Sequence, residues 1–195
     1  MTSTAFLQYC LAGISIGGIY ALIAIGYTMV YGILRLINFA HGDIFMMAAY
    51  FMIFAMVDFM LPWYVSIGIV LVATVVLGVV IERVAYKPLR SAPRMSIMIS
   101  AIGVSYLLQN FALYITGGLT KTDPEIGFLQ KTVKIGSATT KMVTVITPVL
   151  TIVLVFLLVM LIKHTKIGMA MRAVSRDFET SSLMGIDINR VITVT

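Results

Sequence analysis

The sequence predicts an all-α polytopic membrane protein, and three observations lead to that fold class. Of its 195 residues 60% are hydrophobic and only 11% are charged, where a soluble domain carries about 25% charged residues. Uncharged stretches recur along the chain, and most reach the roughly 18 residues that a spanning helix needs. Most lysines and arginines lie between these stretches. The expected architecture is therefore a membrane helical bundle that forms a single transmembrane domain over residues 1–195.

Five complete spans are expected. The uncharged stretches cover residues 1–34, 44–57, 62–81, 95–120 and 142–162. The second is short, and it reaches spanning length when Asp58 and Phe59 are added near an interface. No lysine or arginine precedes Arg35, so the first stretch lacks the basic segment of a cleavable signal peptide and is expected to remain as a helix.

The positions of the basic residues predict the orientation. Arg35 and the basic residues within 83–94 and 163–190 flank the spans, and basic residues in short flanking loops stay on the cytoplasmic side. The N-terminus and the extracytoplasmic loop 117–141 then face outward, although that loop carries four lysines. A net charge of +6 would suggest nucleic acid in a soluble chain, but here it fits a membrane topology, and no nucleic-acid partner is expected.

The first helix is expected at residues 6–31. Gly13, Gly17 and Ala21 follow one another at four-residue spacing, which places three small side chains on one face. Such a face favours close packing against another helix, and a gap for substrate is the alternative.

The next three helices are expected at residues 44–59, 63–83 and 96–115. The fourth helix carries polar side chains, which more often form hydrogen bonds between helices than contact a ligand. These are Ser100, Ser105, Gln109 and Asn110.

The outer loop 117–141 contains partial alternation around Gly136 and Ser137. A solvated loop is favoured there, and a small hairpin or a docking surface for an outside partner stays open. A fifth helix follows at residues 142–162. The last five residues, 191–195, have the pattern of the start of a sixth span, so the chain is expected to be a C-terminally truncated fragment.

The stretch LRLINFAHGD at residues 34–43 interrupts the apolar pattern with polar side chains. It fits either a cytoplasmic turn or a helix broken within the bundle, and the break is favoured because LINFAHG is too apolar for an ordinary loop. The unwound backbone at Asn38, His41, Gly42 and Asp43 would then line a cavity, and Asn38, His41 and Asp43 would hold the break in shape by hydrogen bonds, with His41 able to pair with Asp43. No metal site or other cofactor is expected, since His164 is the one other histidine and no cysteine or carboxylate cluster accompanies His41.

The segment 163–190 is the longest polar stretch expected on the cytoplasmic side. Asp177 is suited to cap a short helix over residues 178–184, and Gly185 is suited to end it. On composition alone, a helix that rests on lipid headgroups and a helix that docks onto a partner are equally supported.

Three stretches carry a family resemblance. They are GGIYALIAIGYTMVYGILRLINFAHGD at residues 17–43, IERVAYKPLR at 81–90 and RAVSRDFETSSLMGIDINRV at 172–191. They resemble, in the same order, the permease subunits of ATP-binding-cassette importers for branched-chain amino acids, and the third is similar to the coupling loop of that family.

The resemblance implies a transport subunit and not an enzyme, in a bacterial or archaeal cytoplasmic (inner) membrane. Its implied partners are two cytoplasmic ATPase chains, a second homologous permease, and a periplasmic or lipid-anchored binding protein for leucine, isoleucine or valine. ATP would be hydrolysed on the partner chains, in agreement with the lack of a G-x-x-x-x-G-K-[ST] phosphate loop in this sequence. The residues implied in ATPase coupling are Arg172, Asp177, Phe178, Glu179, Leu183, Met184 and Gly185.

Other functions stay open. A permease of the same family for urea or short amides would share these features. An ion-coupled carrier or channel would need carboxylates in several spans. A membrane scaffold would tolerate loss of the helix that follows Asp177.

Overall fold

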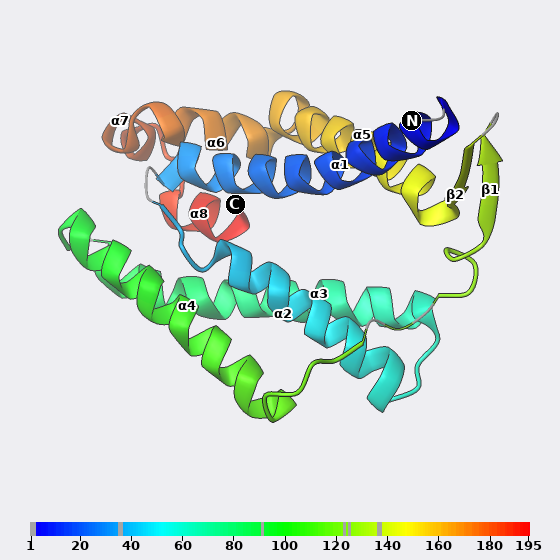
Figure 1. Cartoon of the computed structure of the whole chain (residues 1–195). Coiled ribbons are helices and arrows are strands. Elements are labelled where there is room, and N and C mark those ends of the chain that lie inside the picture. Colours follow the sequence, from blue (N-terminus) through cyan, green and yellow to red (C-terminus); the bar gives the residue numbers. More distant parts are fainter. Residues whose placement is uncertain (1–2, 35–36, 91, 123, 125, 136–137) are drawn as a thin grey trace. The chain divides into compact units, whose positions relative to one another are not determined.

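The computed structural model describes residues 3–34, 37–90, 92–122, 124, 126–135 and 138–195, and helices dominate it (Figure 1). Five described helices are long and apolar enough to cross a membrane. They cover Ala5–Ile33, His41–Asp58, Trp63–Leu89, Met95–Thr116 and Met142–His164. The predicted all-α polytopic membrane fold is therefore confirmed, with each expected span at its expected place in the sequence.

The chain divides into two compact units. The first unit contains Met1–Ile33 and Glu125–Thr195, and the second contains Leu34–Pro124. The first unit therefore joins the N-terminal helix to the C-terminal third of the chain.

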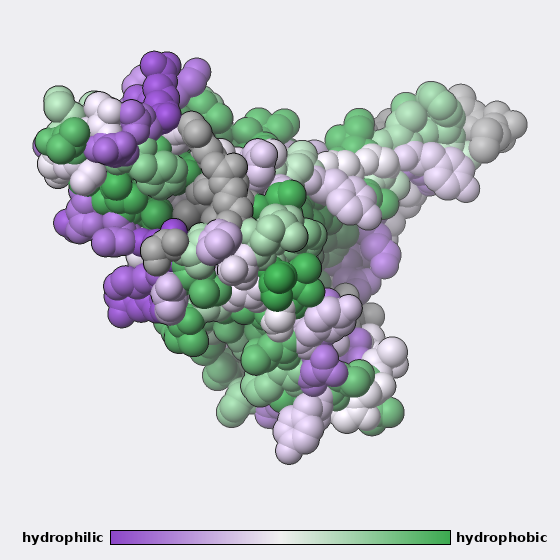
Figure 2. Space-filling model, turned by 90° about the vertical axis from the view of Figure 1, so that its left-hand side faces the viewer, coloured by the Kyte–Doolittle hydropathy of each residue, from purple (hydrophilic) through white to green (hydrophobic). Residues whose placement is uncertain are grey.

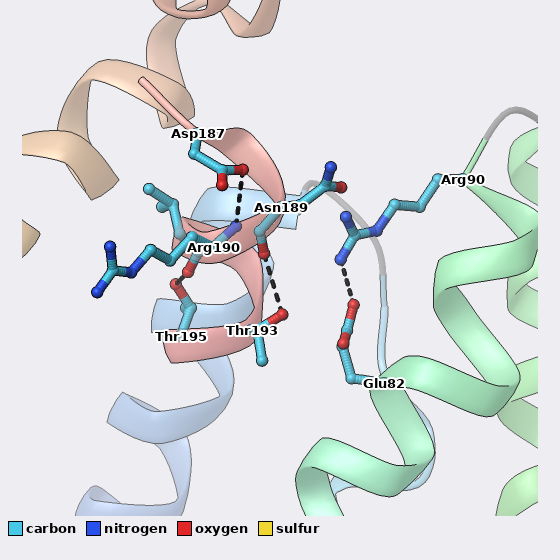
Figure 3. Close-up of polar contacts among 8 residues, drawn as sticks. Glu82, Arg90, Asp187, Asn189, Arg190, Thr193 and Thr195 are labelled. Carbon is cyan, nitrogen blue, oxygen red and sulfur yellow. Dashed lines mark hydrogen bonds and ion pairs between the residues drawn. The ribbon is translucent and has the colours of Figure 1, made fainter. Parts of the chain in front are cut away.

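Three long helices form the second unit. They are α2 (His41–Ile53), which continues into the π-helical turn η1 (Phe54–Asp58); α3 (Trp63–Ile81), which continues into the π-helical turn η2 (Glu82–Tyr86) and the 3₁₀ turn η3 (Lys87–Leu89); and α4 (Arg94–Thr116). Met47 of α2, Ile81 of α3 and Leu108 of α4 are buried together where the three helices meet. An ion pair from Arg90 to Glu82 ties the end of η3 back to η2 (Figure 3).

The first unit combines one long N-terminal helix with the C-terminal elements. They are α1 (Ser3–Leu34), the strands β1 (Thr132–Ile135) and β2 (Ala138–Lys141), α5 (Met142–His164), α6 (Lys166–Arg176), α7 (Phe178–Leu183) and α8 (Ile188–Val194). Figure 1 shows α6 and α8 beside the end of α1. Their shared core is Ile33, Met171, Val174 and Val191.

The close approach of α1 to α5 occurs at Gly18. A Cβ atom at this residue would lie 3.0 Å from the Thr151 hydroxyl oxygen, whereas no atom lies within 4 Å of such a position at Gly13 or Gly17. No other described element therefore packs closely against Gly13 or Gly17. The packing role of the face formed by Gly13, Gly17 and Ala21 stays a prediction.

The C-terminal region contains more helix than the sequence analysis predicts. The helix α6 lies in a stretch that was expected to be a polar loop, and α8 begins at Ile188 and not at Val191. The Asp187 carboxylate accepts a hydrogen bond from the Arg190 amide at 3.2 Å and so caps α8 (Figure 3). The signal for α6 was present, because Ile167, Met171 and Val174 recur at helical spacing.

A small hairpin replaces the solvated loop that was favoured for residues 132–141. The two strands pair antiparallel, with Thr132 opposite Lys141 and Lys134 opposite Thr139. The small hairpin that was left open as an alternative is therefore confirmed, and the docking surface stays a prediction.

Apolar side chains cover much of the surface in the view of Figure 2. On α3, Val72 and Val75 are each 66% exposed, and on α5 Ile152 is 69% exposed. Water would penalise such surfaces, whereas lipid tails solvate them at little cost. These faces are suited to a bilayer or to other apolar helices.

Candidate functional site

The connection from α5 to α6 brings the two helices unusually close together. At Gly168, a Cβ atom would lie 2.3 Å from the Ile162 carbonyl oxygen and 2.5 Å from that of Leu161. Both are backbone atoms at the end of α5, so they cannot rotate away as a side chain does. Only glycine allows α6 to pass this close to the end of the preceding span.

Two side chains reinforce this junction. The Thr165 hydroxyl accepts a hydrogen bond from the Gly168 amide at 3.0 Å and donates one to the Leu161 carbonyl at 2.6 Å. Arg172 donates from Nη1 to the carbonyls of Ile162 at 2.7 Å and Lys163 at 3.3 Å. The last carbonyls of a helix have no partner within it and favour positive charge. Arg172 therefore fastens α6 to the end of α5.

The opposite side of α6 packs into the core of the first unit. Met171 is 2% exposed and Val174 is fully buried, and both lie against Ile33 of α1 and Val191 of α8. Burying two side chains of this size contributes about 3–6 kcal/mol in area terms, an upper estimate. Packing and hydrogen bonds thus hold α6 from two sides.

Both ends of α7 are closed by local signals. The Asp177 carboxylate accepts hydrogen bonds from the amides of Glu179 at 2.9 Å and Thr180 at 3.3 Å. At the other end, the Gly185 amide donates to the Ser182 carbonyl and the Ile186 amide to the Ser181 carbonyl. This pair of bonds is a Schellman motif, which needs a left-handed residue at its turn.

Gly185 is that residue, with φ at +81°. The predicted N-cap and the predicted terminating glycine are both observed.

The side chains of α7 divide into an anchor and an exposed tip. Phe178 packs against the core cluster of α6, and Ser181 is buried. Leu183 and Met184 are 84% and 78% exposed. Two large apolar side chains exposed together at the end of a rigid helix are typical of a protein contact.

Replacing Asp177 with alanine is expected to destabilise α7 by about 1 kcal/mol, because two backbone amides lose their acceptor. Asparagine caps a helix about as well without a charge, so Asp177→Asn is expected to preserve it. Hydrogen exchange at the α7 amides of the purified protein measures the difference. Wild-type protection in the alanine variant would contradict the capping role.

A second polar cluster lies where α2 begins. The Asn38 side-chain oxygen accepts hydrogen bonds from the Ala40 amide at 3.1 Å and from the Tyr86 hydroxyl at 2.7 Å. The Asn38 carbonyl also accepts from the His41 amide at 3.2 Å. Residues 37–40 are not part of a helix, and these bonds connect Asn38 to the start of α2 and to η2. Arg35 lies outside the described residues.

Asp43 is buried in the first turn of α2 and accepts a hydrogen bond from Gln109 Nε2 at 3.0 Å. Gln109 comes 15 residues after Arg94, the first residue of α4, which corresponds to about 22 Å of helix rise. The start of α2 therefore lies beside a point well within the length of the α4 span, and not beside the first turns of α4. The expected pairing of His41 with Asp43 stays a prediction, as does a role for Gly42.

A double-mutant cycle tests the contact between Asp43 and Gln109. The two alanine substitutions are expected to be non-additive by about 1 kcal/mol, since hydrogen bonds between membrane helices have this order of strength. Reversible unfolding in mixed micelles gives the four stabilities. Asn110 serves as the control, because its side chain bonds to Tyr106 of its own helix. The cycle of Asp43 with Asn110 is expected to give a coupling energy near zero. An equally small coupling energy between Asp43 and Gln109 would disprove the contact.

Several positioning residues were missed by sequence reasoning. Gly168, Thr165 and Tyr86 act through contacts with other elements, which no local pattern reveals. The polar positions of α4 were better anticipated, since Gln109 bonds to α2 and Ser100 donates to the Ala85 carbonyl of η2. Among the described residues no group of three or more histidine, cysteine or acidic side chains is placed to hold a metal ion.

Five helices of membrane length, with a capped short helix outside them, define a polytopic membrane protein. The chain belongs to the family described as "Branched-chain amino acid transport system / permease component", whose model matches residues 9–195. Family membership and the five candidate spans make it a multi-pass inner-membrane protein.

Three relatives place the chain more closely within that family. The high-affinity branched-chain amino acid transport system permease protein LivH of Salmonella typhimurium and LivH of Escherichia coli K12 are each 38% identical to it, and the match covers 97% of this chain. The permease protein BraD of Pseudomonas aeruginosa is 34% identical. The chain spans 65% of the length of both LivH proteins and 66% of BraD. No solved structure matches the chain.

Proposed function

We propose that this chain is a transmembrane permease subunit of an ATP-driven importer for the branched-chain amino acids leucine, isoleucine and valine. Its partners are two cytoplasmic ATPases, a second homologous permease and an extracytoplasmic binding protein. The substrate class is the one named for the LivH and BraD relatives. The observation that carries the proposal is the construction of α7, a capped helix with an exposed apolar tip on a rigid support.

In this proposal α7 is the coupling helix. Leu183 and Met184 enter a cleft on the ATPase, and Glu179 lies exposed beside them. Phe178 anchors the helix to the permease, while Asp177 and Gly185 keep its ends fixed. A stiff helix moves as a rigid body with its partner, whereas a flexible loop would absorb the movement.

The support beneath α7 determines where that movement goes. Arg172 and Gly168 join α6 to the last turn of α5, and Met171 joins it to the end of α1. A displacement of α7 would therefore move α5 and α1 together. Arg172 contributes to ATPase coupling in this proposal by positioning α6.

Translocation is assigned to the break that precedes α2. The depth of the bond from Gln109 to Asp43 along α4 supports a break inside the membrane. Unwound backbone at that depth is tolerated where it lines a cavity. Asn38, His41, Gly42 and Asp43 are the residues assigned to this part of the path.

The orientation follows from the basic residues. The segments that contain η2, η3 and α6 to α8 face the cytoplasm, and the N-terminus and the β1–β2 hairpin face outward. This places α7 on the side where ATP is available.

Co-expression with candidate ATPase and binding-protein chains tests the function. The purified complex in nanodiscs is expected to hydrolyse ATP faster when binding protein loaded with leucine is added. If a binding protein loaded with urea or a short amide stimulated ATP hydrolysis instead, the chain would be a permease for that substrate. Uptake without any ATPase chain would indicate an ion-coupled carrier and would overturn the proposal.

A further inference from the structure

The β1–β2 hairpin has two different faces. Successive side chains of a strand point to opposite sides of a sheet, and the register places Lys134 opposite Thr139 and Thr132 opposite Lys141. These four residues share one face and are all exposed. On the other face, Val133 is half-buried. The hairpin therefore turns its lysine-bearing side away from the rest of the first unit.

The hairpin is held in place by three hydrogen bonds outside its own strands. Gln8 of α1 donates to the Thr139 carbonyl at 3.0 Å. The amides of Met142 and Val143, the first residues of α5, donate to the carbonyls of Lys131 at 2.9 Å and Leu129 at 3.1 Å. An isolated two-stranded hairpin is marginal in water, so these bonds to two spans give the lysine face a fixed position.

The charge of this face has one sign. Lys134 and Lys141 are exposed on it, and residues 126–141 contain no aspartate or glutamate. Basic residues near spans normally favour the cytoplasmic side, so topology does not account for two exposed lysines on one face of an outer hairpin. A fixed positive face of this kind is suited to a partner surface of negative charge.

We propose that the lysine face of the hairpin, which carries Lys134 and Lys141, is a docking surface for an acidic patch on the extracytoplasmic binding protein. The inference rests on the proposed function, because that function supplies the partner and the outward orientation. The bonds to α1 and α5 mean that a partner on this face presses against the outer ends of the two spans that carry α6 at their other ends.

Charge reversal in the assembled transporter tests the inference. In the complete complex in nanodiscs, Lys134→Glu combined with Lys141→Glu is expected to weaken binding of the loaded binding protein about tenfold, mainly through slower association. ATP hydrolysis without binding protein is expected to stay at the wild-type rate. Raising the salt concentration is expected to weaken the wild-type complex and to affect the reversed variant much less.

Lys121→Glu is the matched control, because Lys121 lies in the same loop outside the hairpin, over the ring of Phe54. It is expected to leave binding nearly unchanged. An equal loss of binding-protein affinity in the control, or wild-type affinity in the reversed variant, would overturn the docking surface. The proposed transport function would still stand if loaded binding protein stimulated ATP hydrolysis. If the reversed variant misassembles, Lys134→Gln with Lys141→Gln and the wild-type salt series decide the matter. Unchanged affinity together with loss of co-purified anionic lipid would show that a lipid occupies the face and would overturn the proposal.

Discussion

Replacing Gly168 with alanine is expected to abolish assembly of the transporter or to reduce uptake more than tenfold. The added Cβ would lie 2.3 Å from the Ile162 carbonyl oxygen and 2.5 Å from that of Leu161. Neither atom can move without unwinding the last turn of α5. Overpacking against side chains costs about 1–3 kcal/mol, and contact with fixed backbone is expected to reach the top of that range.

The expected failure begins locally. When α6 moves away from α5, Arg172 loses its carbonyl acceptors, and Met171 and Val174 leave the core they share with α1 and α8. The variant is expected to insert normally, since its spans are unchanged, and to fail in binding the ATPase. Quantitative pull-down of the ATPase from solubilised membranes measures this loss.

Gly103→Ala in α4 is the control for the Gly168 experiment. No atom lies within 4 Å of a Cβ atom at Gly103, and alanine improves helix propensity by about 1 kcal/mol over glycine. This variant is expected to match or exceed the wild-type stability. If the Gly168→Ala and Gly103→Ala variants bound equal amounts of the ATPase, the close contact between α5 and α6 would not matter for coupling.

The contrast between α6 and α7 explains how much of the site could be predicted from the sequence. The ends of α7 depend on residues close to it in the chain, Asp177 and Gly185, and local signals identified both. The junction before α6 depends on Gly168 meeting the backbone of a preceding helix. Glycine in a polar stretch has many possible reasons, and only the fold distinguishes them.

The break before α2 shows the same division. The polar residues of LINFAHGD were recognisable as exceptional in an apolar chain. Their partners were not, because Tyr86 and Gln109 come 48 and 66 residues after the groups that they contact. Spans, by contrast, follow from composition alone, since a bilayer imposes the same length and polarity on each helix.

Replacing Gly185 with valine is expected to uncouple uptake from ATP hydrolysis while leaving membrane insertion intact. Gly185 has φ at +81°, and a β-branched residue resists the left-handed region by about 2 kcal/mol. With only six residues, α7 cannot distribute that strain over further turns. A penalty of this size corresponds to a roughly 30-fold fall in the population of the correctly terminated helix.

The matched control for valine is Gly185→Asn, because asparagine tolerates the left-handed region better than other residues with a side chain. No atom lies within 4 Å of a Cβ atom at this position, so a difference between the two variants would report backbone strain and not crowding. The complex with asparagine is expected to retain most of its uptake, and the complex with valine to hydrolyse ATP with little response to loaded binding protein. Wild-type uptake in the valine variant would mean that the end of α7 can be remodelled freely, and α7 would then not be the coupling helix.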